Sequence, residues 1–459
     1  MLGFLTEGSA PTVAILSVCF VLVLAFEFSN GFHDTANAVA TVIYTNSLRP
    51  TQAVVWSGVM NFIGVIAGGI AVAYALVELV PPEVLSPPDG GRAVGMLASV
   101  FISALIWNVG TWWLALPNSS SHALIGSLIG ITAAEAVGQG RTLTMAIDWP
   151  QIANVLAGLL VSPILGFVLA LVLFKLLARI ISDKRAFEPP QEGRSPPLWM
   201  RGLLILTCTG VSFSHGTNDG QKSIGLIMLT VIGLMPATYA LNRSMSEAQI
   251  RAIADRMPVA VDLIGRRGDS RKDQGINSAN ALHTRFSQLK SPADIPDADR
   301  SAVRNDVYHV LAALRAAAGS PDLTKAERAK AKATHDEIMR SVEYAPWWVR
   351  VLSALCLGLG TMIGYRRVVK TLGERLGREH LVPAQGASAE LVAAGLIGFA
   401  GFTGYPVSTT HVLTGGIAGT MVASGAGLHR TTVSRIALAW ILTLPGTIAT
   451  SALLFYLLS

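Results

Sequence analysis

The sequence predicts an all-α polytopic membrane protein with two inverted repeats, re-entrant hairpins and one extramembrane helical insert. The first observation is composition, because 51% of the 459 residues are hydrophobic and 14% are charged, against ~25% charged in soluble domains. The second is that residues 242–345 hold 31 of the 64 charged residues. The rest of the chain is too apolar for a water-soluble globule. This excludes a soluble enzyme, a nucleic-acid binder and a disordered protein.

Long apolar runs account for most of the chain. Runs long enough to cross ~30 Å of hydrocarbon as a helix lie at 11–30, 51–80, 93–116, 151–181, 201–214, 222–241, 346–365, 386–403 and 433–457. Two more runs, 119–137 and 408–424, begin with polar clusters and are predicted to be broken or re-entrant. No Lys or Arg precedes the first run, so we expect a retained membrane helix rather than an export signal.

Charge and hydropathy predict five parts. These are a first membrane repeat at 1–181, a cytoplasmic linker at 182–200, the start of a second repeat at 201–241, an extramembrane helical insert at 242–345 and the remainder of the second repeat at 346–459. Basic residues around the linker and at 366–378 indicate cytoplasmic loops. Both loops are cytoplasmic if each half crosses the membrane an odd number of times. The two halves are then antiparallel, and both chain ends and the insert are expected to lie outside.

Two pairs of motifs show that the chain is duplicated. GFHDTANA at 31–38 corresponds to GTNDGQKS at 216–223, with an offset of 185 residues. PNSSSHALIG at 117–126 corresponds to PVSTTHVLTG at 406–415, with an offset of 289 residues. The offsets differ by 104 residues, which is the length of the insert, so one duplication and one insertion explain both pairs. Duplicated halves are typical of secondary transporters.

The two hydroxyl clusters are candidate anion sites. Each places three hydroxyl residues at the start of a predicted helix, where Ser and Thr are favoured caps. Inside a bilayer, the hydroxyls, the unpaired backbone N–H groups and the positive end of the helix dipole suit a tetrahedral oxyanion. The alternative is an ordinary cap at an interfacial loop. The residues concerned are Ser119, Ser120, Ser121, Ser408, Thr409 and Thr410.

The paired motifs also contain ionisable residues at membrane depth, which are by default functional candidates. Asp34 and Asp219, at the predicted helix ends, either ligate a coupling cation or accept a hydrogen bond from a protonated oxyanion. Asn37 corresponds to Lys222, whose ammonium would occupy the place of a sodium ion. This favours proton coupling, the alternative being a lysine that reaches to the interface.

Further candidates for handling charge or protons lie near these motifs. Histidine titrates near neutral pH, although a histidine of this kind is more often a hydrogen-bonded structural group. Glu27 is a carboxyl inside an apolar run. The histidines are His33, His122, His215 and His411.

The motifs resemble those of the inorganic phosphate transporter (PiT) family, nearest to its bacterial low-affinity phosphate/proton symporters. The resemblance covers roughly 10–241 and 345–459 and implies import of inorganic phosphate, free or as a neutral divalent metal–phosphate complex. His33 and Lys222 depart from the family pattern, which puts sodium coupling in doubt. The phosphate and ion ligands that it implies are Asp34, Asn37, Ser119, Ser120, Ser121, Asn218, Asp219, Ser408, Thr409 and Thr410.

We therefore expect a multi-pass transporter of the inner (plasma) membrane, not an enzyme. Its partners are inorganic phosphate, protons, divalent metals complexed with phosphate, the lipid bilayer and a second copy in a homo-oligomer. No cofactor, resident metal or nucleic acid is expected. The alternatives are a sulfate/proton symporter, a sodium-coupled phosphate symporter, an intramembrane Ser–His hydrolase and a passive anion channel. Paired broken helices favour alternating access over a channel.

Overall fold

The computed structural model describes residues 10–73, 90–143, 149–190, 195–267, 272–405 and 407–458. These ranges are helical, with one isolated antiparallel bridge between Gly377 and Leu428. The chain forms two compact units. The first takes in 1–80, 94–227 and 346–459, and the second 81–93 and 228–345.

Within the described residues, each half of the chain supplies five helices that correspond in order. In the first half these are α2 (Ala10–Tyr44), α3 (Pro50–Ala67), α6 (Gly90–Trp113), α7 (Ser120–Gly138) and α9 (Trp149–Ile180). Their counterparts by the two sequence offsets are α10 (Leu198–Leu234), α16 (Trp347–Thr361), α18 (Pro383–Thr403), α19 (Thr409–Ser424) and α20 (Arg430–Leu458). Short helices lie between them: η1 (Lys184–Ala186), α11 (Pro236–Tyr239), α17 (Arg366–Lys370) and η3 (Thr371–Arg375).

The membrane character of the fold is confirmed. Among the described residues, six helices are long and apolar enough to cross a membrane, or seven when the pair 347–361 and 366–375, bent by 53°, counts as one span. The two segments predicted to be broken or re-entrant, 119–137 and 408–424, form α7 and α19, each of which begins at a hydroxyl cluster. We refer to α7 and α19, each with the loop before it, as the two hairpins. The chain is thus a polytopic helical protein.

The Asp motifs lie inside helices, not at their ends. The sequence predicts that helix 11–30 stops before GFHDTANA and that 201–214 and 222–241 are separate, but α2 and α10 each run unbroken through their motif. A helix satisfies its own backbone groups, and the polar side chains of both motifs, apart from Asn218, find hydrogen-bond partners within the first unit. The polar motif that interrupts each apolar run therefore marks a candidate functional site and not the end of a helix.

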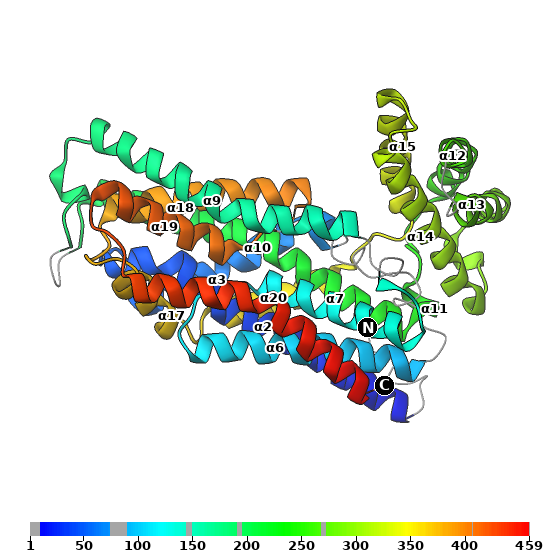
Figure 1. The fold of residues 1–459 in the computed structure, drawn as a ribbon, viewed down its shortest axis with the longest axis horizontal. Coiled ribbons are helices and arrows are strands. Elements are labelled where there is room, and N and C mark those ends of the chain that lie inside the picture. The colour runs from blue at the N-terminus through cyan, green and yellow to red at the C-terminus, as the bar shows by residue number, and fades with distance from the viewer. Residues whose placement is uncertain are drawn as a thin grey trace. The chain divides into compact units, whose positions relative to one another are not determined.

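The two halves are interleaved and run in opposite directions. In Figure 1, α2 begins at the right and runs leftward, whereas α10 begins at the left and runs rightward. Helix α7 packs on α20 and α19 packs on α9, so each hairpin helix contacts the last helix of the other half. Gly130 of α7 meets the backbone of Ile448, and Gly419 of α19 meets that of Phe167. A glycine permits this close approach of two backbones.

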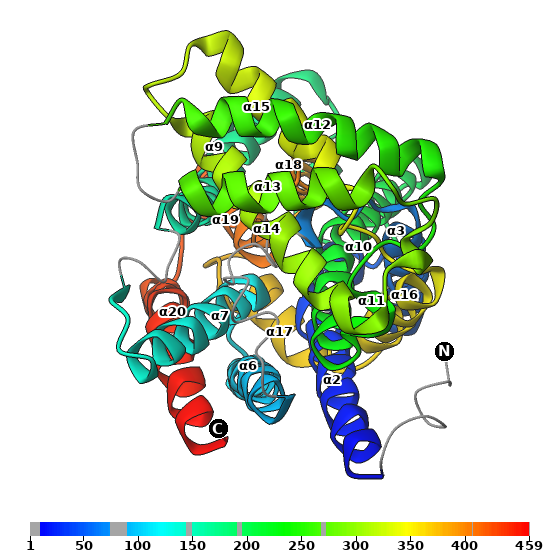
Figure 2. The same ribbon diagram turned by 90° about the vertical axis from the view of Figure 1, so that its right-hand side faces the viewer.

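In its described part, the charged insert forms α12 to α15 of the second unit, seen in Figure 2. Its core contains apolar residues from all four, and a buried Arg304 donates to Ala240 O at 2.6 Å and to Tyr308 Oη at 2.5 Å. Capping boxes at Ser246 and Thr324 begin the first and last of them. A short helix, η2 (Pro292–Asp294), lies among the four, which are α12 (Glu247–Gly265), α13 (Lys272–Phe286), α14 (Asp297–Gly319) and α15 (Lys325–Met339).

Candidate functional site

Two helices begin inside the protein, and their hydroxyl clusters cap them. Ser119 precedes α7 and accepts from the backbone N–H of His122 at 3.2 Å. Ser408 precedes α19 and accepts from the backbone N–H of His411 at 3.2 Å. Both caps are 1% exposed. The structure thus buries two positive helix ends, each lined with hydroxyls, in the first unit.

Asp34, on α2, faces the cluster of the second half. Its Oδ1 accepts from Thr410 Oγ1 and, at 3.3 Å, from Asn37 Nδ2. Its Oδ2 lies 3.4 Å from Thr409 Oγ1 and 3.4 Å from His215 Nε2. This carboxylate is 3% exposed, so hydrogen bonds from protein donors replace the water that it loses on burial.

Asp219, on α10, pairs with the lysine of its own motif. Lys222 Nζ lies 2.7 Å from Asp219 Oδ1 and donates to Ser121 Oγ at 2.6 Å and to Val407 O at 3.2 Å. These three oxygens use all three ammonium donors. Lys222 is 2% exposed and does not reach to the interface, which overturns that alternative.

The two clusters of contacts are related by the duplication. Ser121 and Thr410 correspond by the 289-residue offset, as Asn37 and Lys222 do by the 185-residue offset. Asn37 Nδ2 donates to Thr410 Oγ1 at 2.9 Å, just as Lys222 Nζ donates to Ser121. Each Asp helix therefore contacts the hairpin of the opposite half, and the site lies where the repeats meet.

His215 joins the two carboxylates. Its Nε2 lies 3.4 Å from Asp34 Oδ2 and 3.5 Å from Asp219 Oδ2, while its Nδ1 lies 2.7 Å from Asn61 Oδ1. Asn61 Nδ2 donates to Thr361 Oγ1 at 3.2 Å, which leaves Oδ1 as the acceptor facing the ring. Both ring nitrogens thus face acceptors, the pattern of an imidazolium. The sequence analysis does not identify Asn61, whose only signal in the sequence is an amide side chain inside an apolar run.

Of the other histidines, His122 and His411 lie at the hairpin starts, and His33 lies beside Asp34 on α2. His122 Nδ1 lies 2.8 Å from Ser119 Oγ, and the His122 and His411 rings lie 4.7 Å apart. His411 stacks on Trp440 at 3.8 Å. His33 contacts Thr111 Oγ1 at 3.3 Å and lies 3.5 Å from Asp34 Oδ1. The His122 and His411 rings thus pack against each other and His411 packs on Trp440, while the Nε2 atom of His411 has no hydrogen-bond partner among the described residues.

Some polar atoms of the predicted ligands have no partner within the described part of the protein. Both amide atoms of Asn218 and the Oδ1 atom of Asn37 are buried without a hydrogen-bond partner among the described residues. Ser120, at the first turn of α7, is 4% exposed. Buried polar groups are normally paired, so these groups have unused capacity for a polar ligand.

Glu27, also on α2, is a buried carboxyl with only neutral hydrogen-bond partners in the described ranges. Its Oε2 accepts from Ser223 Oγ, and its Oε1 lies 3.5 Å from Ser353 Oγ. Ser223 directly follows Lys222 in the chain. Glu390, on α18, is equally buried and accepts from Thr207.

The comparisons with known proteins agree on one family. A model of the Phosphate transporter family matches residues 30–451. The chain is 38% identical to the low-affinity inorganic phosphate transporter PitA of Escherichia coli K12, with 97% of each chain covered. It is 37% identical to PitB of the same strain, over 100% of this chain and 99% of that one.

A solved structure shares the fold. The sodium-dependent phosphate transporter matches with a TM-score of 0.55 and 19% identity, over 97% of this chain and 99% of that chain. At this identity the match shows the arrangement of helices and nothing about the coupling ion.

Proposed function

The chain belongs to the phosphate transporter family, and we propose that it imports inorganic phosphate across the inner membrane by proton symport. It is a transporter, as its relatives are, and not an enzyme. The observation that carries the proposal is the meeting of two buried, hydroxyl-capped helix starts with two carboxylates at the contact between the halves. Alternating access by movement of one half against the other would expose this site to each side in turn.

The chemistry of the site favours phosphate over sulfate. Helix N-termini and hydroxyls donate to any tetrahedral oxyanion. A carboxylate accepts only, so Asp34 and Asp219 select an anion that still has a proton to donate. Hydrogen phosphate has one at neutral pH and sulfate has none. We assign the anion contacts to Ser120, Ser121, Thr409, Thr410 and Asn218.

The oxygen cage around Lys222 supports proton coupling. A carboxylate, a hydroxyl and a backbone carbonyl surround its ammonium at 2.6–3.2 Å. Oxygen ligands of these kinds are also those of hard cations. With a covalently fixed cation in this place, a mobile sodium ion is not needed to balance Asp219. The driving ion is then H⁺.

Glu27 is the group that we assign to carry the proton. A buried carboxylate without a cation is costly in a membrane, so Glu27 holds a proton while it is enclosed and releases it when the site opens to the cytoplasm. Asp34 and Asp219 face His215 and Lys222 and stay charged as substrate ligands.

A metal–phosphate complex is a second candidate substrate. Ligand atoms of Asp34, His215 and Asp219 lie within 4.8 Å of one another, close enough to contact one divalent ion. The ion would be cargo, and its charge would neutralise the phosphate. Binding requires His215 to lose a proton, so it competes with the imidazolium arrangement. Uptake of ⁵⁴Mn²⁺ that rises with phosphate and saturates with it would support this candidate.

Proteoliposomes test the proposal directly. We expect ³²P-phosphate to accumulate in sodium-free vesicles under an inward proton gradient, and an uncoupler to abolish the accumulation. Sulfate at equal concentration should not compete. Accumulation that begins only when Na⁺ is added would replace proton coupling with sodium coupling. Equilibration without accumulation would indicate a passive channel.

A further inference from the structure

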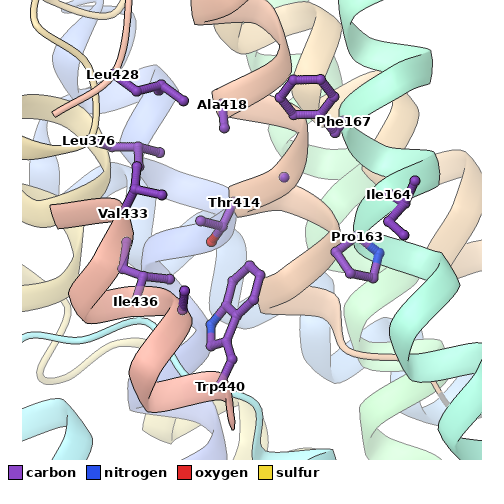
Figure 3. A pocket seen from close by; sticks show the side chains of 12 residues that line it. Pro163, Ile164, Phe167, Leu376, Thr414, Ala418, Leu428, Val433, Ile436 and Trp440 are labelled. Carbon is purple, nitrogen blue, oxygen red and sulfur yellow. The ribbon is translucent and has the colours of Figure 1, made fainter. Parts of the chain in front are cut away.

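An apolar cavity of about 380 Å³ lies between α9, α19 and α20 in the first unit. Figure 3 shows Leu376 and Leu428 at one end and Trp440 at the other, with Phe167 on the side of α9. Ile164, which also lines it, is 62% exposed. The cavity is therefore continuous with the apolar outer surface of α9, which in a membrane protein faces lipid.

Basic residues surround the Leu376–Leu428 end. Arg378 donates from Nε to Leu428 O at 3.3 Å, and His429 donates its backbone N–H to Leu376 O at 3.0 Å. Arg375 and Arg430 are exposed within two residues of these leucines. The acidic neighbours are Glu374 and Glu379, of which Glu374 already contacts Lys370 and Tyr44. The same segment, 366–378, is the one whose charge predicts a cytoplasmic loop.

We propose that this cavity binds one acyl chain of an anionic phospholipid whose headgroup lies on Arg375, Arg378 and Arg430. An apolar slot that opens to the lipid-facing surface fits a hydrocarbon chain, and three arginines at its end fit a negatively charged headgroup. Basic pockets at the cytoplasmic side of membrane helices bind lipids of this class. A zwitterionic lipid would fill the slot but would gain little from the arginines.

The occupant would also support the phosphate site. Trp440 lines the cavity, donates from Nε1 to Pro117 O at 3.0 Å and stacks on His411 at 3.8 Å. Pro117 and His411 belong to the two opposite hairpins. An acyl chain packed against the face of Trp440 that lines the cavity would hold the indole in place. Through its contacts with Pro117 and His411, the indole would in turn hold the starts of α7 and α19.

Photolabelling of the full chain in nanodiscs tests the proposal. The probes are phosphatidylglycerol and phosphatidylcholine that carry a diazirine on one acyl chain, and labelled peptides are identified by mass spectrometry. We expect phosphatidylglycerol to label 163–167 and 433–440 well above phosphatidylcholine. Neutralising Arg378 and Arg430 with glutamine should lower this preference about fivefold for each arginine.

Two further variants separate the cavity from the general lipid surface. Ala418→Phe fills the cavity and should abolish labelling by both lipids, whereas Ala449→Phe makes the same change at an exposed position of α20 outside it and should not. Equal labelling of the cavity peptides by both lipids in the unmodified chain overturns the proposal, and so does full labelling of Ala418→Phe. The comparison of lipids in the unmodified chain stands even if a variant folds poorly.

Discussion

The Lys222 ammonium on α10 donates a 2.6 Å hydrogen bond to the Ser121 hydroxyl on α7, which joins a helix of the second half to a hairpin of the first. Asn37 makes the corresponding bond to Thr410 at 2.9 Å. The duplication thus keeps the contact and changes its charge, from an amide on one side to a fixed cation on the other. We therefore expect the coupling ion, H⁺ or Na⁺, to depend on whether this position holds a lysine or an asparagine.

Lys222→Asn should remove proton-driven phosphate uptake. The substitution makes the second half resemble the first, and an amide oxygen in place of the ammonium provides a ligand for Na⁺ while leaving Asp219 without its cation. We expect uptake under a pH gradient to fall by at least about tenfold, since breaking a buried ion pair costs several kcal/mol. Gain of Na⁺-dependent uptake would support the argument further. Full proton-driven uptake by Lys222→Asn would falsify it.

Asp219→Asn should abolish transport and destabilise the protein, because Lys222 then keeps a buried charge without a carboxylate. The expected loss of stability is about 3–5 kcal/mol, measured as a lower midpoint of thermal aggregation in detergent. Adding Lys222→Asn to Asp219→Asn should restore stability but not transport. If the single variant melts normally, the ion pair contributes little.

Asp34→Asn should also lose transport, since the variant keeps the shape of the side chain but not its charge. Thr410 and Asn37 would still donate to an amide oxygen in the place of Oδ1, so we expect normal abundance in the membrane. We expect a loss of uptake of at least about 100-fold, from charged hydrogen bonds of roughly 1.5–3 kcal/mol each. Wild-type uptake by Asp34→Asn would leave this aspartate without a role in transport.

Ser120→Ala and Thr409→Ala should each weaken phosphate binding. Either change removes one hydroxyl donor from a buried site, which costs about 1–3 kcal/mol. This corresponds to a rise of roughly five- to 150-fold in the KM for phosphate. The comparison variant is Thr403→Ala, an exposed residue of α18 outside the clusters. An unchanged KM for phosphate in both test variants would show that the hydroxyl clusters do not bind the anion.

Glu27→Gln should separate exchange from net transport. Glutamine imitates a permanently protonated Glu27, so the carrier should still exchange internal for external phosphate but should not accumulate it under a proton gradient. Glu390→Gln is the matched control, as an equally buried carboxyl that contacts Thr207 on another part of α10. Proton-driven accumulation by Glu27→Gln would show that another group carries the coupled proton.

Gly419→Ala should destabilise the fold by about 1–3 kcal/mol, because an added methyl group would overlap the backbone of Phe167 on α9 and overpacking costs of this size are usual. Gly395→Ala, with nothing within 4 Å of the new methyl group, should melt like the parent protein. Equal melting temperatures for the two variants would show that α9 and α19 can move apart without loss.

The sequence by itself determined the kind of protein and the residue types of the site. Apolar runs specify membrane helices because the bilayer leaves a backbone few other choices. The motif pairs reveal the duplication because their two offsets differ by the length of the charged insert. The hydroxyl clusters predict the starts of α7 and α19 because capping is a local interaction, made within three residues of Ser119 and Ser408.

Only the tertiary structure decided how these parts combine. Nothing in the spacing shows that Asp34 meets Thr410 of the opposite half, that Asn61 orients His215, or that α2 runs unbroken through its polar motif. The partner of a buried polar group depends on which helices pack together, and those partners are up to 376 residues away in the chain. The same packing keeps Lys222 within the site, although its long side chain could have reached the interface, because Asp219, Ser121 and Val407 satisfy all of its donors there.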